Sequence, residues 1–191
     1  MRLELKSYLA NEIDTLLSWI TTEKELRQWA GPTIFTWPIN KKQLFNYLAR
    51  TQGAYPEAII LKAIEKTNLI VGHIEFDKID WINKTTILSR VIIAPKFRNN
   101  GLGHEIVDLA LYDAFDVFRF NEIKLSVYNF NHSALRCYKA AGFKTTDTIK
   151  DPKGDEVENW STQIMSLSSI EYRIKQNSKK CPNSAADEKI I

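Results

Sequence analysis

The stretch that decides the fold is Val91-Ile92-Ile93-Ala94-Pro95-Lys96-Phe97-Arg98-Asn99-Asn100-Gly101-Leu102-Gly103. Its first part is an apolar strand that stops at Pro95, and apolar residues recur at helical spacing after Gly101. A turn of this kind between a strand and a helix is typical of anion sites. The reason is that the first N–H groups of a helix have no internal acceptor and carry the positive end of the helix dipole. The sequence therefore predicts a phosphate-binding turn.

Two glycines and a cation make this turn suitable for a pyrophosphate. Gly101 and Gly103 have no Cβ to obstruct the ligand, and Arg98, together with Lys96, adds positive charge beside it. The sequence has no P-loop pattern, and a dinucleotide fingerprint would need a glycine in place of Ile106. The alternative is the start of a helix with two glycines and no ligand, and the turn alone does not decide between the two.

The surroundings of the turn closely resemble the coenzyme A motif of the GCN5-related N-acetyltransferases (GNAT). The family pattern Gln/Arg-x-x-Gly-x-Gly/Ala is met by Arg98, Gly101 and Gly103. A second block resembles the later family pattern Asn-x-x-Ala-x-x-x-Tyr followed by Gly-Phe, and consists of Asn131, Ala134, Tyr138, Gly142 and Phe143. Two blocks in the family order favour an acetyl-coenzyme A site over an unliganded helix start. The resemblance covers about the first 166 to 172 residues.

The resemblance implies an α/β (α+β) fold with a mixed, mostly antiparallel sheet of about six to seven strands and about four helices. It places the acetyl donor in a cleft where the strands Ile87 to Ala94 and Lys124 to Phe130 splay apart. An N–H group near Val91 to Ile93 would donate to the thioester carbonyl. The implied cofactor-binding residues are Val91, Ile92, Ile93, Arg98, Asn99, Asn100, Gly101, Leu102, Gly103, Asn131 and Tyr138.

Tyr138 is the predicted general acid. The resemblance implies that it faces the sulfur of the donor, and a phenol with a pKa of about 10 stays protonated at neutral pH. Without the second block, a tyrosine that packs the back of a short helix would be the ordinary interpretation. For Asn131, binding the donor and capping a turn or helix are equally good interpretations.

Glu75 is the predicted general base, which must remove a proton from the attacking ammonium. On a strand, His73, Glu75 and Asp77 point to one face and form a polar stripe that reaches the cleft through a water. The alternative is a solvated sheet face. Ser89 is a further, weaker candidate for the base.

Composition predicts one soluble globular domain, because the 191 residues are 44% hydrophobic and 26% charged. The net charge of +3 gives no strong field for nucleic acid. Cys137 and Cys181 do not form a disulfide framework, and neither these nor His104 and His132 have the spacing of a metal site, so no metal is expected. No signal peptide and no apolar run of about 18 residues is present, which favours the cytoplasm and no membrane partner.

Periodicity predicts a strand, two helices, a three-stranded antiparallel meander and then alternating strands and helices. Asn11 and Asn40 are the expected caps of the first two helices, and residues Trp29 to Pro38 are expected to be an aromatic-rich loop that walls the substrate site. Residues 1–172 are expected to form the acyltransferase domain, and 173–191 a polar C-terminal tail. The predicted strands are Leu3 to Leu9, Ala58 to Ile64, Leu69 to Asp77, Thr85 to Ala94, Glu122 to Phe130, one beginning at Phe143, and Asn159 to Ser166; the later helices run from Gly101 to Val117 and from Ala134 to Ala141.

The predicted function is transfer of an acetyl group from acetyl-coenzyme A to a primary amine, by direct attack in a ternary complex. The sequence does not decide whether the acceptor is a protein N-terminus, a polyamine, an amino sugar or an amino-acid derivative. Residues Trp29 to Trp37 resemble the acceptor side of the ribosomal-protein N-acetyltransferase branch. The alternative function is a non-catalytic acyl-coenzyme A-binding regulatory module. The chain is expected to be a monomer or a homodimer.

Overall fold

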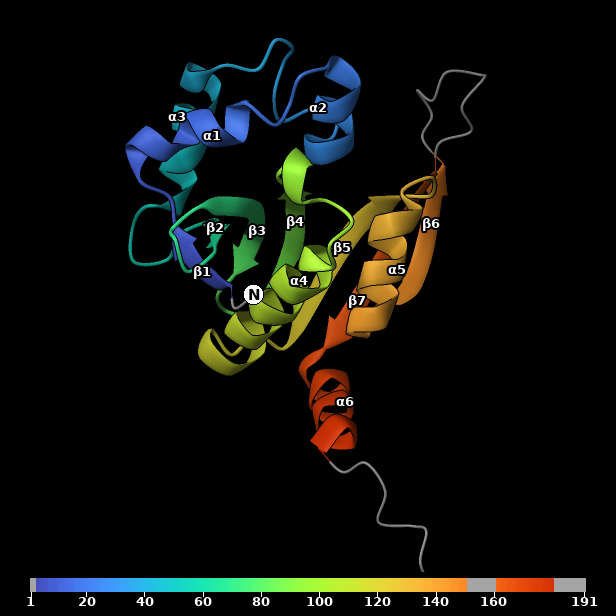
Figure 1. Cartoon of the computed structure of the whole chain (residues 1–191). Coiled ribbons are helices and arrows are strands. Elements are labelled where there is room, and N and C mark those ends of the chain that lie inside the picture. The colour runs from blue at the N-terminus through green and yellow to red at the C-terminus, as the bar shows by residue number, and fades with distance from the viewer. Residues whose placement is uncertain (1–2, 151–160, 181–191) are drawn as a thin grey trace, which may run out of the picture.

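The computed structural model describes residues 3–150 and 161–180. Its centre is a seven-stranded sheet with the strand order β1-β2-β3-β4-β5-β7-β6 (Figure 1). The strands are β1 (Glu4–Ser7), β2 (Ile59–Ile64), β3 (Ile70–Asp80), β4 (Thr85–Ile93), β5 (Glu122–Tyr128), β6 (Lys144–Lys150) and β7 (Ser161–Ser168). The neighbouring strands are antiparallel except for β4 and β5, which are parallel. The predicted fold class and the antiparallel meander of β2, β3 and β4 are confirmed.

Six α-helices lie in the described residues, rather than about four. They are α1 (Ile13–Leu17), α2 (Glu23–Ala30), α3 (Lys41–Leu48), α4 (Leu102–Tyr112), α5 (His132–Ala141) and α6 (Ser169–Lys180). Short 3-10 turns cover Ala10–Glu12, Ala49–Thr51 and Pro95–Phe97, and a π-helical turn, Asp113–Val117, continues α4. The predicted helices after Gly101 and before Gly142 are present, and Gly142 has a φ of +113°, as a left-handed helix end requires.

Two apolar cores lie on the two faces of the sheet. Helices α4 and α5 cover one face, where Ile106 and Leu135 pack in one cluster with Ile74 of β3. Helices α1, α2 and α3 supply a second cluster, in which Leu44 packs near Ile60 of β2. Because both faces are covered, the neighbouring strands β2 and β3 are buried along most of their length.

The N-terminal helices differ from the prediction. Asn11 caps nothing: it lies inside the 3-10 turn, and Glu12 closes that turn by accepting from Leu9 N at 2.6 Å. The first two residues of the loop predicted from residue 29 belong to α2. The periodicity of the sequence did not predict this helix. Thr22 and Glu25 form a capping box at its start, with Glu25 N donating to Thr22 Oγ1 at 3.2 Å. Asn40, in contrast, caps α3 as predicted, by accepting from Gln43 N.

The C-terminal part is also more helical than expected. The first residues of the tail predicted from residue 173 belong to helix α6. Tyr172 anchors this helix on the first core: it is 5% exposed, and the centroid of its ring lies 4.9 Å from that of Phe115. Ser168 and Glu171 cap its start. The tail residues 181–191 and the predicted strand start at Asn159 lie outside the described residues.

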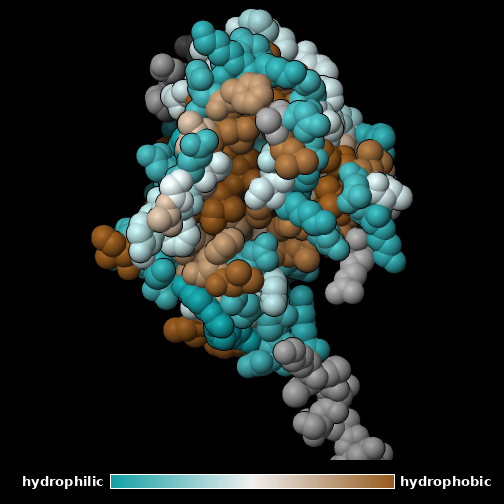
Figure 2. Space-filling view, turned by 90° about the vertical axis from the view of Figure 1, so that its left-hand side faces the viewer, coloured by the Kyte–Doolittle hydropathy of each residue, from teal (hydrophilic) through white to brown (hydrophobic). Residues whose placement is uncertain are grey.

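The surface is not uniformly polar. On the side that faces left in Figure 1, hydrophobic residues gather in a hollow across the middle of the molecule, with hydrophilic residues around it (Figure 2). None of the helices in residues 3–150 and 161–180 is long and apolar enough to cross a membrane.

Candidate active site

The parallel strands β4 and β5 separate soon after they begin. Their pairing runs only from Thr85 opposite Glu122 to Ile87 opposite Lys124. Beyond this point a cleft of about 840 Å³ opens, lined on one side by the rest of β4 and on the other by residues 126–128 of β5. The splayed strands that the resemblance implied are therefore present, and the cleft has the volume of a small-molecule site.

A β-bulge lies in the part of β4 that lines the cleft. Ser89 pairs with Glu75 and Ile92 with His73, so β4 has one more residue than β3 between these pairs. At the bulge Arg90 has a φ of +49°, a conformation that costs a non-glycine residue about 1–2 kcal/mol. The side chains of Leu88 and Val91 consequently pack on the same core although they are three residues apart.

The predicted phosphate turn closes one end of the cleft. Gly101 is the N-cap of α4 with a φ of +77°, and no side chain caps this helix. A Cβ added to Gly103 would meet no atom closer than Cys137 Sγ at 4.0 Å, so protein packing does not explain this glycine. Arg98 lines the cleft here, with its Nε donating to Ile93 O at 3.1 Å. An uncapped helix start with room for a ligand fits a phosphate group.

The start of α5 forms the opposite wall beside this turn. Asn131 lines the cleft and also caps α5, because its Oδ1 accepts from Ala134 N at 3.2 Å. Ser133 and Arg136 of α5 line the cleft too, and the prediction missed both. They lie three residues apart and both are exposed, so the helical spacing of polar residues after Asn131 was the signal that could have found them.

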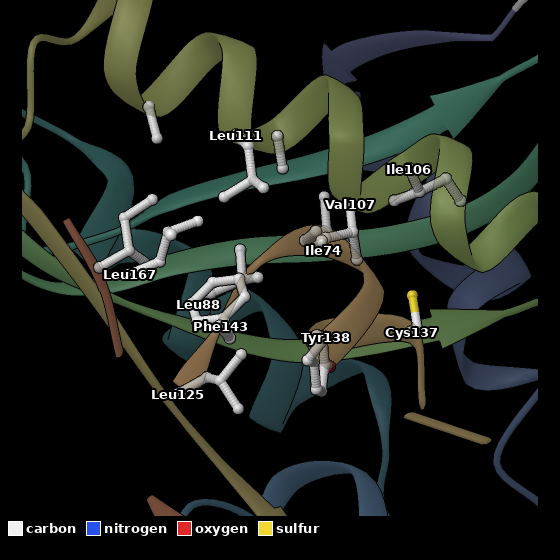
Figure 3. Close-up of a cluster of buried hydrophobic side chains, with 14 of the residues drawn as sticks. Ile74, Leu88, Ile106, Val107, Leu111, Leu125, Cys137, Tyr138, Phe143 and Leu167 are labelled. Atoms are coloured by element: carbon white, nitrogen blue, oxygen red, sulfur yellow. The ribbon is translucent and has the colours of Figure 1, made fainter. Parts of the chain in front are cut away.

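Tyr138 lines the cleft and is 9% exposed. Burial, and to a lesser degree Cys137, raises the pKa of its phenol well above the ordinary value, so the hydroxyl is protonated at neutral pH. Its ring packs edge-on against Phe143, with the centroids 5.9 Å apart (Figure 3). The hydroxyl has no hydrogen-bond partner in the part of the chain that the structure describes. Tyr138 therefore has a proton donor that no described residue uses.

Cys137 turns the other way, with its sulfur toward α4 (Figure 3). Burial, with a contribution from Asp108, raises the pKa of its thiol to about 11. A protonated thiol is a poor nucleophile, so this cysteine does not have the character of an acyl-enzyme residue.

Glu75 does not line the cleft. It is 1% exposed and its carboxylate accepts from His73 Nε2 at 2.7 Å, Tyr47 Oη at 2.7 Å and Arg90 Nε at 2.6 Å. Burial raises the pKa of this carboxyl, but these partners outweigh burial and lower it overall. The stripe of His73, Glu75 and Asp77 is thus neither a solvated face nor a cleft wall, because α1 to α3 cover it.

The other end of the cleft lies under the C-terminal end of α2. Trp29 donates from Nε1 to Arg90 O at 2.8 Å and stacks on Phe35 with the rings 3° from parallel. Gly31 and Pro32 continue this wall, and Ser89 faces it from β4. Of the loop predicted to wall the substrate site, Trp29 lies on a helix and lines the cleft with Gly31 and Pro32, whereas Trp37 and Pro38 do not line it. Within residues 3–150 and 161–180 no three His, Cys, Asp or Glu side chains are grouped as metal ligands.

The chain is similar to solved acetyltransferase structures. Spermidine N-acetyltransferase from Vibrio cholerae in complex with CoA and spermine is 15% identical with a TM-score of 0.78, over 90% of this chain and 98% of that one. A dodecameric structure of spermidine N-acetyltransferase from the same organism, in an intermediate state, is 16% identical with a TM-score of 0.72, over 90% and 96% of the chains. At these identities the likeness shows the fold.

The family itself is shown by the sequence. A model of the acetyltransferase (GNAT) family matches residues 16–143, which is more than half of the 191 residues and includes the turn at Gly101, the cleft edge of β4 and Tyr138. The chain belongs to the acetyltransferase (GNAT) family.

Proposed function

We propose that this protein transfers the acetyl group of acetyl-coenzyme A directly to a primary amine. The observation that carries the proposal is the cleft between β4 and β5, which has an uncapped helix start at one end and a protonated tyrosine in its wall. An anion-binding turn suits the pyrophosphate of coenzyme A, and a proton donor suits its sulfur. Membership of the acetyltransferase family supports acetyl-coenzyme A as the donor.

In this proposal the turn from Arg98 to Gly103 holds the pyrophosphate through main-chain N–H groups. The pantetheine arm lies along Val91 to Ile93, whose main chain borders the cleft where β5 no longer pairs with β4. Asn131 and Arg136 contact the donor from the start of α5. Arg136 adds a positive charge that suits a phosphate.

The transfer needs no covalent enzyme intermediate. The neutral amine attacks the thioester carbon, and the carbonyl oxygen gains negative charge, which an N–H group of β4 stabilises by about 3 kcal/mol. The C–S bond then breaks, the nitrogen gives up its extra proton to water, and the sulfur leaves as coenzyme A with a hydrogen bond or a proton from Tyr138. Because a thiol has a pKa of about 8.5, below that of the phenol, the hydrogen bond is the larger part of this role. The role of Glu75 as the base stays a prediction.

The acceptor enters, in this proposal, beneath α2. Trp29, Gly31 and Pro32 form an apolar wall there, and Glu25 is the acidic side chain that lines this end. A carboxylate beside an apolar wall suits an acceptor that is cationic as well as an amine. Polyamines are the first acceptors to test, since a similar structure was determined with spermine.

The test is release of free thiol from acetyl-coenzyme A with a panel of amines: spermidine, spermine, peptides with free N-termini, amino sugars and amino-acid amides. Amine-dependent release, with an acetylated product in the mass spectrum, supports the proposal. Tight binding of coenzyme A without release for any amine would instead support a non-catalytic acyl-coenzyme A-binding module. A protein that does not bind coenzyme A would exclude both functions.

A further inference from the structure

A buried charge network lies directly behind the cleft edge of β4. Arg90 Nε donates to Glu75 Oε2 at 2.6 Å, and the same guanidinium pairs with Asp77. Each of these three side chains belongs to a residue that is less than 9% exposed. Arg50 Nη2 binds the other oxygen of Asp77 at 2.6 Å. The guanidinium of Arg90 is thus held by two carboxylates of the neighbouring strand β3.

The main chain of Arg90 is held as well. Its carbonyl oxygen accepts from the indole of Trp29, and its φ of +49° marks the extra residue of the bulge. The guanidinium also lies over the ring of Tyr47, at 5.0 Å from the centroid. Arg90 therefore ties the bulge to β3, α2 and α3 together.

The bulge decides which groups β4 presents to the cleft. Ser89, next to Arg90, lines the cleft, and its hydroxyl is buried without a partner in the described part of the chain. Val91 to Ile93, beyond the bulge, line the same cleft. A shift of the extra residue by one position would move these groups to opposite faces. A buried hydroxyl without a partner is costly, which favours a ligand atom as its partner.

We infer that Arg90 is a positioning residue: its clamp on Glu75 and Asp77 holds the bulge of β4, so that Ser89 and the main chain of Val91 to Ile93 meet the bound thioester and amine. The inference rests on the proposed function. Arg90 acts through the main chain and touches no substrate with its guanidinium. A lysine would keep the charge but lose the planar fork, so it would not hold both carboxylates in the same geometry.

The variants Arg90→Lys and Arg50→Lys form a matched pair. Both arginines pair with Asp77, and both lie over the ring of Tyr47, at 5.0 and 5.1 Å. Only Arg90 lies in β4 and lines the cleft. We expect Arg90→Lys to lower kcat on the order of 10-fold or more, because small displacements at a reacting centre are costly. The dissociation constant for coenzyme A should rise by a smaller factor than kcat falls, since the phosphate turn is intact and only the pantetheine arm lies along the displaced strand.

The control Arg50→Lys should lower the melting temperature to a similar extent but keep kcat within about 2-fold of wild type. Hydrogen exchange gives a readout that does not depend on turnover: amides of residues 88–93 should exchange faster in Arg90→Lys and not in Arg50→Lys. Equal losses of kcat in both variants, or unchanged exchange in β4 with unchanged kcat, would overturn the inference.

If Arg90→Lys does not fold, Asp77→Asn takes its place, because it keeps the side-chain shape and removes one charge from the clamp. We expect the same pattern for Asp77→Asn: lower kcat, faster exchange in β4 and a smaller effect on the binding of coenzyme A. An Asp77→Asn protein with wild-type kcat and wild-type exchange would refute the clamp. If the wild type releases no thiol with any amine, the proposed function fails, and the exchange comparison still decides whether Arg90 holds the bulge.

Discussion

The side chain of Tyr138 is largely buried, its phenol is protonated at neutral pH, and its hydroxyl has no hydrogen-bond partner among the described residues, which gives a clear expectation for removing the hydroxyl. Tyr138→Phe should lower kcat about 10- to 100-fold, because the leaving sulfur loses its hydrogen-bond donor. The change should leave the melting temperature within about 2 °C, since no protein hydrogen bond is lost. Steady-state kinetics over several amines and thermal unfolding measure the two effects.

The role of Tyr138 is also tested by the pH profile of kcat in the wild type, and the results for Tyr138→Phe can contradict it. The pH profile of kcat in the wild type should show no loss from ionisation of this phenol up to about pH 10, because burial raises its pKa above that ordinary value. Unchanged kcat in Tyr138→Phe would remove it as the acid, and a large fall in melting temperature would show that its hydroxyl supports the fold instead.

Substitutions of Gly103 can test the binding of coenzyme A without disturbing the fold. A Cβ at this position meets only Cys137 Sγ at 4.0 Å, so Gly103→Ala should fold normally and bind coenzyme A nearly as well, as the Gly/Ala of the family pattern implies. Gly103→Val fills the space over the helix start and should weaken binding of coenzyme A by about 10-fold or more, while stability changes by less than about 1 kcal/mol. Calorimetry with coenzyme A and thermal unfolding distinguish the effects. Equal binding by both variants would show that no ligand approaches this glycine.

Single residues also show where sequence reasoning failed. The alternation of His73, Glu75 and Asp77 correctly indicates one face of a strand, but by itself it predicts a face that is open to water or to the cleft. Burial under α1 to α3 cannot be seen from alternation, because it depends on segments far away in the sequence. The place of Tyr138 in the cleft, in contrast, is predictable because a local block of residues surrounds it.

The start of α6 gives a pH-dependent prediction. A hydrogen bond from Lys144 and others from Ser168 lower the pKa of Glu171 to about 2. Because the pKa is lower in the folded chain than the ordinary 4.5, this carboxylate stabilises the fold above about pH 4.5, and the contribution is lost as the pH falls toward 2. Glu171→Gln should therefore be less stable than wild type at pH 6 by up to about 1 kcal/mol, with the difference shrinking toward pH 2.

Thermal unfolding at several pH values measures that difference. Glu4→Gln is the matched control, since Glu4 pairs with Lys6 at 3.0 Å on an exposed strand and caps no helix. Its effect should be close to zero at every pH. A constant difference between wild type and Glu171→Gln from pH 6 to pH 2 would contradict the role of this carboxylate.

Elements were predictable where their signals are local. Asn40 marked α3, and Gly142 marked the end of α5. The capping box of Thr22 and Glu25 is an equally local signal for α2, but the tryptophans and prolines that follow it are typical of a loop. The bulge at Arg90 had no local signal, since it depends on ion pairs with β3. Helix α6 is polar on most sides, and Tyr172 is the buried residue through which it packs on the first core.

On the scale of the whole molecule, the order of strands and helices made the fold predictable, and the cleft follows from it. The sheet consists of two parts, β1 to β4 and β5 to β7, which share only three residue pairs between β4 and β5. Both parts line the cleft, as does the turn before α4. A ligand in the cleft would contact both parts, and it should therefore stabilise the molecule as a unit.

Coenzyme A at about 100 times its dissociation constant should stabilise the fold by about 2.7 kcal/mol and raise the melting temperature by about 5–10 °C. Hydrogen exchange should slow in the cleft edges, residues 88–93 and 126–128, and at the helix starts after Gly101 and Asn131, while β1 and β2, which do not line the cleft, change little. In Gly103→Val, the same concentration of coenzyme A should raise the melting temperature by less than in the wild type. Protection confined to one part of the sheet would mean that the ligand does not bridge β4 and β5, and the cleft would then not be the donor site.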